Sequence, residues 1–223
     1  DIAGLVKGAS KGEGLGNKFL SHIREVDAII HLVRCFDSDK ITHVNSKINP
    51  VDDLETIKTE IILSDLDIIQ KKLEKGKKKL LDKKDVEILE DKLKQLNNGR
   101  EIVVNNKDEL KFLTTLGLLS IKPKIIVCNV DEESLAEGNS FTESIKKNYS
   151  KEKVVTICAD IEDQIMDLDN NERETFMKEI GLNKTGLNQL IKEGYELLNL
   201  DTFFTSGPEE SRAWTIEKNT PAP

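Results

Sequence analysis

DIAGLVKGASKGEGLGNK, residues 1–18, opens the chain and places five of its thirteen glycines within the first sixteen positions. So dense a run of glycine does not favour regular structure. Beside small polar side chains and the lysines Lys7 and Lys11, it suits a backbone that approaches an anionic ligand or has to move. We interpret the stretch as a nucleotide-sensing loop around which the rest of the chain is organised. A domain rarely begins at its own working loop, so we expect the sequence to be a fragment.

The composition excludes several classes of protein. The 223 residues are 37% hydrophobic, which is enough to bury a core, and the net charge of −8 argues against a general nucleic-acid binder. No DNA partner is expected. No apolar run approaches the roughly 18 residues of a membrane span, so no membrane association is expected. The odd number of cysteines, without Cys-x-x-Cys spacing, is typical of the reducing cytoplasm.

Strand and helix patterns alternate along much of the chain. Apolar runs at 27–36, 124–130 and 154–159 are nearly continuous, as in strands that are buried on both faces of a parallel sheet. Polar residues follow the last two runs, at the carboxyl edge where α/β proteins usually bind ligands. The sequence therefore predicts an α/β fold. The expected helices of this part are 17–26, 141–148, 170–180 and 186–198.

Between the first two strands the pattern becomes helical. Apolar residues recur every three or four positions over 54–73 and again over 86–96, which predicts two amphipathic helices in an antiparallel hairpin. We expect this hairpin to be an insertion over residues 53–113, followed by a short returning helix within 108–119. Its tip, Lys71 to Lys84, holds eight lysines and two acids. Such a tip is either a solvated turn or a positive surface that touches RNA phosphates.

The first candidate site is Asp1-x-x-Gly4. In phosphate-binding α/β domains such an Asp holds Mg²⁺ through water, and the glycine N–H meets the terminal phosphate. The alternative is a simple turn. The later glycines lack the G-x-G-x-x-G spacing of a dinucleotide fingerprint, and no G-x-x-x-x-G-K-[ST] loop occurs in the sequence.

A second candidate site follows the predicted strands. Asn129 and Glu132, spaced i and i+3 around Val130, can recognise the edge of a purine, or else form an Asx turn that caps the next helix. Cys158 and Ala159 offer main-chain amides behind a base, or simply end their strand. The three histidines lack metal-ligand spacing, and His43 is expected near the phosphate side.

Together these segments resemble the Obg-like ATPases, the YchF family of P-loop nucleotidases. The resemblance is carried by residues 1–20, Val33-Arg34-Cys35-Phe36, Asn129-Val130-Asp131-Glu132, and residues 194–200 through Arg212-Ala213-Trp214-Thr215. It implies part of a Ras-like G-domain sheet, an inserted helical coiled coil and the start of a TGS domain. The implied domains are 1–52 and 114–198 for the G domain, 53–113 for the insertion and 199–223 for the TGS domain.

The resemblance also assigns roles to residues. Asp1 and Gly4 would serve Mg²⁺ and the γ-phosphate, and His43 would assist hydrolysis because Leu5 stands where many GTPases keep a water-orienting Gln. Glu132 stands where GTPases carry an Asp that recognises guanine, so the family prefers ATP to GTP. Further nucleotide contacts would come from Asn129, Val130, Cys158 and Ala159.

The implied function is an ATP-hydrolysing switch in the cytoplasm. Its implied partner is the ribosome or ribosomal RNA, contacted through the lysine-rich hairpin 71–84 and the TGS domain. The alternatives are a GTP-selective Obg-type GTPase, a binding module that nucleotide only stabilises, and a structural helical adaptor. Since the P-loop is absent from this sequence, we expect the 223 residues alone to bind ATP weakly and not to hydrolyse it.

Overall fold

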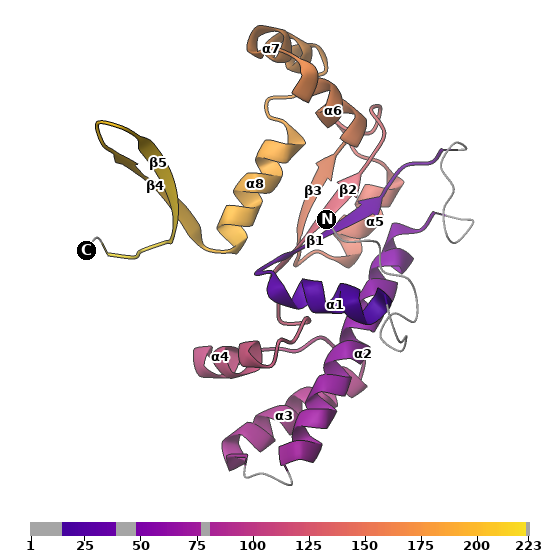
Figure 1. Cartoon of the computed structure of the whole chain (residues 1–223). Coiled ribbons are helices and arrows are strands. Elements are labelled where there is room, and N and C mark those ends of the chain that lie inside the picture. The colour runs from indigo at the N-terminus through magenta and orange to yellow at the C-terminus, as the bar shows by residue number, and fades with distance from the viewer. Residues whose placement is uncertain (1–14, 39–47, 77–80, 222–223) are drawn as a thin grey trace. The chain divides into compact units, whose positions relative to one another are not determined.

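A computed structural model describes residues 15–38, 48–76 and 81–221 of the chain. It divides into two compact units, Asp1–Asp27 with Asp52–Lys122 and Ala28–Val51 with Pro123–Pro223. We call them the helical unit and the sheet unit. Figure 1 shows the elements, which are α1 (Leu15–Glu25), β1 (Ile29–Arg34), α2 (Pro50–Gly76), α3 (Lys83–Asn97), α4 (Lys107–Thr115), β2 (Lys124–Asn129), α5 (Ser140–Asn148), β3 (Lys153–Ile157), α6 (Ala159–Asp167), α7 (Asn170–Glu179), α8 (Gly186–Leu197), β4 (Leu200–Ser206) and β5 (Ser211–Glu217).

The sheet unit is built on three parallel strands in the order β1-β2-β3. The central strand β2 is the most buried, because Ile125 to Cys128 are all covered. On one face, Leu190 and Leu197 of α8 pack over β2 and β3, while α5 lies on the other side of the sheet (Figure 1). The parallel strands and their covering helices confirm the predicted α/β fold.

The edge strand β1 differs from the prediction of burial on both faces. Ile30 and Leu32 are 54% and 62% exposed, whereas Val33, which points to the opposite face of the same strand, is only 4% exposed. The register pairs Ile30 with Ile125 and Leu32 with Val127, so both exposed side chains share the face that α8 covers. The apolar residues of α8 in that cluster pack over β2 and β3, which leaves this face of β1 open.

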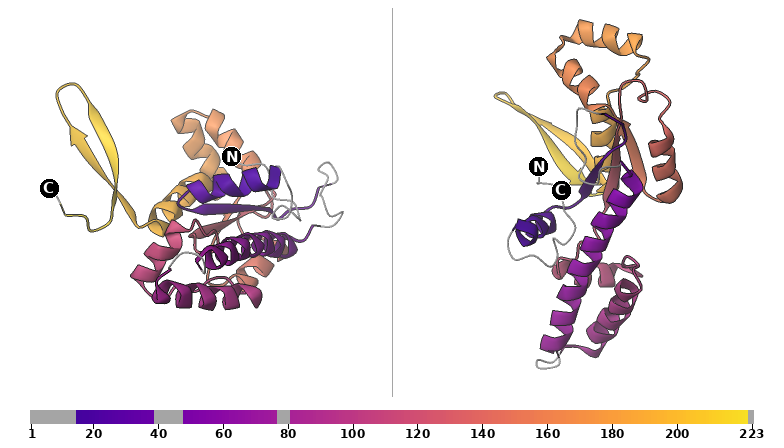
Figure 2. Two further views of the ribbon diagram at one scale, coloured as in Figure 1. Left: turned by 60° about the horizontal axis from the view of Figure 1, so that its bottom comes forward. Right: turned by 90° about the vertical axis from the view of Figure 1, so that its right-hand side faces the viewer.

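The helical unit has its own apolar core. The amphipathic faces of α2 and α3 bring together Ile62, Ile69, Leu89 and Leu96, and Leu113 of α4 joins them. Figure 2 shows α2 and α3 side by side in both of its views. This pairing matches the hairpin that the periodicity predicts, and α2 extends further than expected, from Pro50 to Gly76.

A buried ion pair links α3 to α4. The Lys92 side chain is 1% exposed, and its Nζ lies 2.5 Å from Glu109 Oε1. It also lies 2.8 Å from Asp91 Oδ2 and donates to the Val103 carbonyl at 2.8 Å. Burial opposes both charges, but these partners outweigh it, so the pKa of Lys92 is raised and the pKa of Glu109 is lowered.

A second buried charge holds the end of this unit. Asp65 on α2 is fully buried, and its carboxylate accepts from the Leu119 and Ser120 amides and from the Ser120 hydroxyl. Burial raises the pKa of Asp65 against these hydrogen bonds. Next to it, Ser64 Oγ accepts from Arg24 Nη2 at 2.6 Å, which ties α1 to α2.

The last two strands form an antiparallel hairpin, β4–β5. Phe203 faces Trp214 across it, and Trp214 Nε1 donates to Thr205 Oγ1 at 2.8 Å. Its turn is closed by the Gly207 amide on the Glu210 carbonyl at 2.8 Å. The aromatic side chains of this hairpin remain largely exposed.

Candidate functional site

The candidate site lies at the carboxyl ends of β2 and β3. Asn129 is the last residue of β2, and Ala159 is the first residue of α6, one position after Cys158 and the end of β3. The Ala159 amide donates to Asn129 Oδ1 at 3.0 Å. This bond turns the carboxamide so that its Nδ2 group points away from Ala159. Nδ2 then supplies N–H donors at the rim, which suits a ligand with ring-nitrogen acceptors.

The loop after β2 is fixed at its start. The Val130 amide donates to the Ile157 carbonyl at 2.8 Å, which continues the sheet pairing by one residue. Asp131 then forms an Asx turn, since its Oδ1 accepts from the Ser134 amide at 2.9 Å. Glu132 is exposed on this turn. The Asx turn expected as an alternative to a site is therefore present, but Asp131 makes it and Asn129 does not.

Cys158 lies under the site and does not reach solvent. Its side chain is 2% exposed, and burial raises the pKa of its thiol. A high pKa keeps the thiol protonated and unreactive, so only the backbone of Cys158 is available to a ligand at this edge. It precedes α6, a helix that the sequence did not predict, whose first amide is the one bound to Asn129.

Glu162, on the same helix, anchors the start of α8. Its carboxylate accepts from the Gly186 amide at 2.6 Å and from the Leu187 amide at 3.2 Å. Gly186 is required by space, because a Cβ at this position would lie 2.6 Å from Ile157 Cγ2. The helix that covers the sheet is thus locked to the strand that carries the site.

The end of β1 lies beside the same edge. The Cys35 amide donates to the Asn129 carbonyl at 2.7 Å, which brings the Val-Arg-Cys-Phe segment next to the end of β2. Arg34 folds the following turn back on the strand, because its guanidinium donates to the carbonyls of Phe36 and Ser38 and lies 4.8 Å from the Phe36 ring. The sequence patterns do not predict this role of Arg34 in folding the turn.

The structure therefore brings five predicted site residues to one edge: Asn129, Val130, Glu132, Cys158 and Ala159. Three others, Asp1, Gly4 and His43, lie outside the described residues. The prediction of a Mg²⁺ site depends on Asp1, so it also lies outside the described residues. Within residues 15–38, 48–76 and 81–221, no group of three or more His, Cys, Asp and Glu side chains is arranged to hold a metal.

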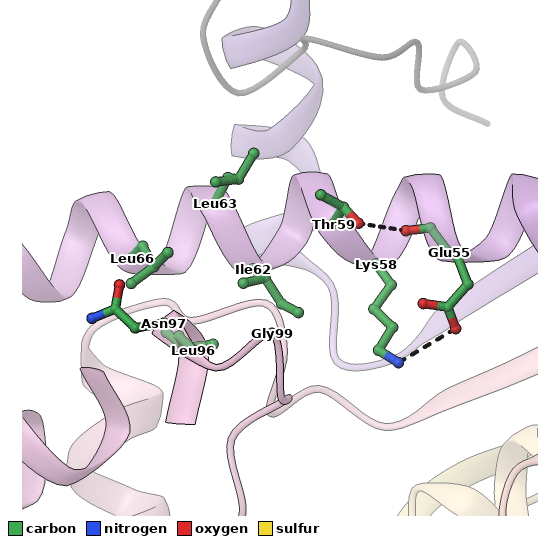
Figure 3. Close-up of a pocket in the computed structure, with 9 residues that line it drawn as sticks. All are labelled: Glu55, Lys58, Thr59, Ile62, Leu63, Leu66, Leu96, Asn97 and Gly99. Carbon is green, nitrogen blue, oxygen red and sulfur yellow. Dashed lines mark hydrogen bonds and ion pairs between the residues drawn. The ribbon is translucent and has the colours of Figure 1, made fainter. Parts of the chain in front are cut away.

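The helical unit contains a separate cavity of about 260 Å³ between α2 and the end of α3. Figure 3 shows an apolar floor with a polar edge, where Lys58 Nζ lies 3.4 Å from Glu55 Oε1 and the Thr59 hydroxyl donates to the Glu55 carbonyl. Its charged groups already pair with one another. The cavity offers no unpaired cation or amide cluster for a phosphate. Its lining residues are Glu55, Lys58, Thr59, Ile62, Leu63, Leu66, Leu96, Asn97 and Gly99.

The described helices include none with the length and apolar character needed to cross a bilayer.

Comparison with known proteins gives a consistent answer over the whole chain, although no family model matches it. Proteins named ribosome-binding ATPase YchF from Escherichia coli O157:H7 and from Bacillus subtilis are each 46% identical over 234 and 235 aligned residues, covering all of this chain. A Mycoplasma pneumoniae protein of the same name is 41% identical. The chain spans 64% of the length of the first two relatives.

Solved structures agree. The structure of the Schizosaccharomyces pombe YchF GTPase matches 99% of this chain and 63% of its own, with a TM-score of 0.83 and 34% sequence identity. Sequence and structure comparisons point to the same relatives, and the fold is the one that the resemblance implied. The chain belongs to the YchF family of P-loop nucleotidases.

Proposed function

We propose that the protein containing this chain is a nucleotide-dependent switch that binds and hydrolyses ATP, in preference to GTP, and acts with the ribosome. The single observation that carries the proposal is the bond from the Ala159 amide to Asn129 Oδ1 at 3.0 Å. It joins the ends of two adjacent parallel strands into one rim, where α/β proteins bind their ligands. The names of the bacterial relatives supply the ATPase and ribosome parts of the proposal.

At this rim, Asn129 Nδ2 donates to a ring nitrogen of the purine, and the backbone around Val130 and Ala159 borders the base. Glu132 is exposed and projects from the turn that follows. An Asp at this position has the length to accept both guanine donors, the N1–H and the 2-amino group. Adenine has neither donor, so the longer Glu132 weakens the selection of guanine and leaves ATP favoured.

The base preference is the direct test of this function, because one relative of known structure is named a GTPase. The full-length Glu132→Asp protein should bind a GTP analogue more tightly relative to an ATP analogue than the wild type does. Glu133→Asp, the same change at the next exposed position, is the matched control and should leave the ratio unaltered. If Glu132→Asp does not raise GTP binding relative to ATP, the account of selectivity is wrong.

Hydrolysis in this proposal uses groups outside the described residues. Asp1 would hold Mg²⁺ through water, Gly4 would meet the γ-phosphate and His43 would assist the attacking water. Bound Mg²⁺ would neutralise charge on the phosphates. The 223-residue chain contains no G-x-x-x-x-G-K-[ST] loop, so we propose that by itself it binds ATP weakly and does not turn it over.

The ribosome contact is assigned to two parts of the chain. The first part is the lysine-rich segment 71–84 at the end of the α2–α3 hairpin, and among its described residues Lys71, Lys75, Lys83 and Lys84 are exposed. The second part is 199–223, the proposed start of a TGS domain. Together with 1–52 and 114–198 as the G domain and 53–113 as the insertion, this proposed division assigns the partner surfaces and the nucleotide residues to different segments of the sequence. Cys35, Cys128 and Cys158 are buried and form no disulfide with one another, which fits a cytoplasmic location.

A further inference from the structure

Asn139 links three segments of the sheet unit at the edge that carries the candidate site. It ends the loop that begins at Asp131 and is the N-cap of α5. Its Oδ1 accepts from the amides of Phe141 and Thr142, each at 3.1 Å. Its Nδ2 donates to the Cys35 carbonyl at 2.7 Å and to Ser134 Oγ at 3.2 Å. One side chain therefore joins α5, the loop after β2 and the end of β1.

The orientation of this carboxamide is fixed by chemistry. Backbone amides only donate, so the atom that faces Phe141 and Thr142 has to be the oxygen. The opposite atom faces the Cys35 carbonyl, which only accepts, and has to be the nitrogen. An Asn side chain offers two acceptor positions and two donor hydrogens, and all four are used here.

The loop between Asp131 and Asn139 is closed around this side chain. The Gly138 amide donates to the Ser134 carbonyl at 2.8 Å, and Gly138 has φ of +82°, a conformation that favours glycine. A Cβ on Gly138 would lie 2.7 Å from Thr142 Oγ1. Thr142 completes the cap, because its hydroxyl accepts from the Asn139 amide at 2.8 Å. The loop carries Glu132, so whatever fixes the loop also fixes the backbone from which that side chain extends.

Two of these bonds serve only to cap α5, while the bond to Cys35 reaches 104 positions back in the sequence. A helix cap does not need that third connection. Since Cys35 itself donates to the Asn129 carbonyl, the bond places the loop relative to the residue that would bind the base. We propose that Asn139 is a positioning residue for purine selection, holding the 131–138 loop and its Glu132 against the ends of β1 and β2.

This inference rests on the proposed function, and its test separates the two. Asn139→Asp and Asn139→Ser both keep an oxygen that caps α5. Both lose the donor to Cys35, the first because a carboxylate only accepts and the second because the side chain is shorter. Asn148→Asp, at an exposed position near the end of α5, is the matched control.

The full-length variants are compared with wild type by two measurements. Amide hydrogen exchange without nucleotide should become about tenfold faster in 131–138 for both Asn139 variants, while α5 keeps its protection. The affinity for a non-hydrolysable ATP analogue should fall about tenfold. The ratio of the affinity for this analogue to the affinity for the matching GTP analogue should also decrease.

Each outcome has one meaning. Faster loop exchange together with weaker, less selective binding supports the inference. Unchanged exchange in 131–138, or faster exchange with unchanged affinity and base preference, overturns it. If wild type binds neither analogue, the proposed function itself fails and the inference falls with it.

Discussion

The buried lysine of the helical unit gives the most demanding prediction. Replacing Lys92 by Met keeps a side chain of similar length but removes three interactions of its Nζ, with Asp91, Glu109 and the Val103 carbonyl. The Glu109 side chain is only 6% exposed, so its carboxylate would lose its cation without gaining water. Breaking a buried pair by removing one partner costs about 3–5 kcal/mol.

The loss of stability can be measured in the helical unit itself, by amide hydrogen exchange. Each 1.36 kcal/mol changes an equilibrium tenfold, so amides of α3 that exchange through opening of the helical unit should exchange about 10²- to 10⁴-fold faster in Lys92→Met. Lys94→Met, at an exposed position two residues further along the same helix, should change exchange by less than about threefold. Equal effects of the two substitutions would refute the reasoning that Lys92 stabilises the unit through burial and pairing.

Four other substitutions have specific expected outcomes. Gly186→Ala should destabilise the sheet unit by about 1–3 kcal/mol in urea unfolding, because its Cβ would meet Ile157. Gly194→Ala on the same helix meets nothing within 4 Å and should stabilise it by about 0.5–1 kcal/mol. The stability advantage of wild type over Glu109→Gln should be full above pH 4.5, the ordinary pKa, and should be lost as pH falls through the lowered folded pKa; an advantage that grows in acid would contradict the sign. His43→Ala in the full-length protein should lower ATP turnover about 10²-fold, and unchanged turnover would remove His43 from the mechanism.

The local patterns of the sequence were sufficient for most of the sheet unit. The apolar runs before Asn129 and Cys158 predicted two buried parallel strands, and parallel strands end at the same edge of a sheet. That rule predicts that Asn129 lies near Ala159, and the bond between them joins the two strand ends. The two helices of the hairpin were equally predictable, because their apolar spacing is local.

Features that depend on distant partners were not predictable in this way. The exposure of Ile30 follows from how far α8 extends across the sheet, which the composition of β1 does not encode. Lys92 looks like any surface lysine until Glu109 is folded against it. The capping pattern of Asn139 with Thr142 could have been found in the sequence, but its bond to Cys35 could not.

The central claim is that the purine binds at the carboxyl ends of β2 and β3. The most direct test is the hydrogen-exchange footprint of a non-hydrolysable ATP analogue on the full-length protein. The account predicts protection at 129–134 and at 158–161, with no change at 55–66 and 96–99, which line the cavity of the helical unit. Protection around that cavity, with none at the two strand ends, would contradict it.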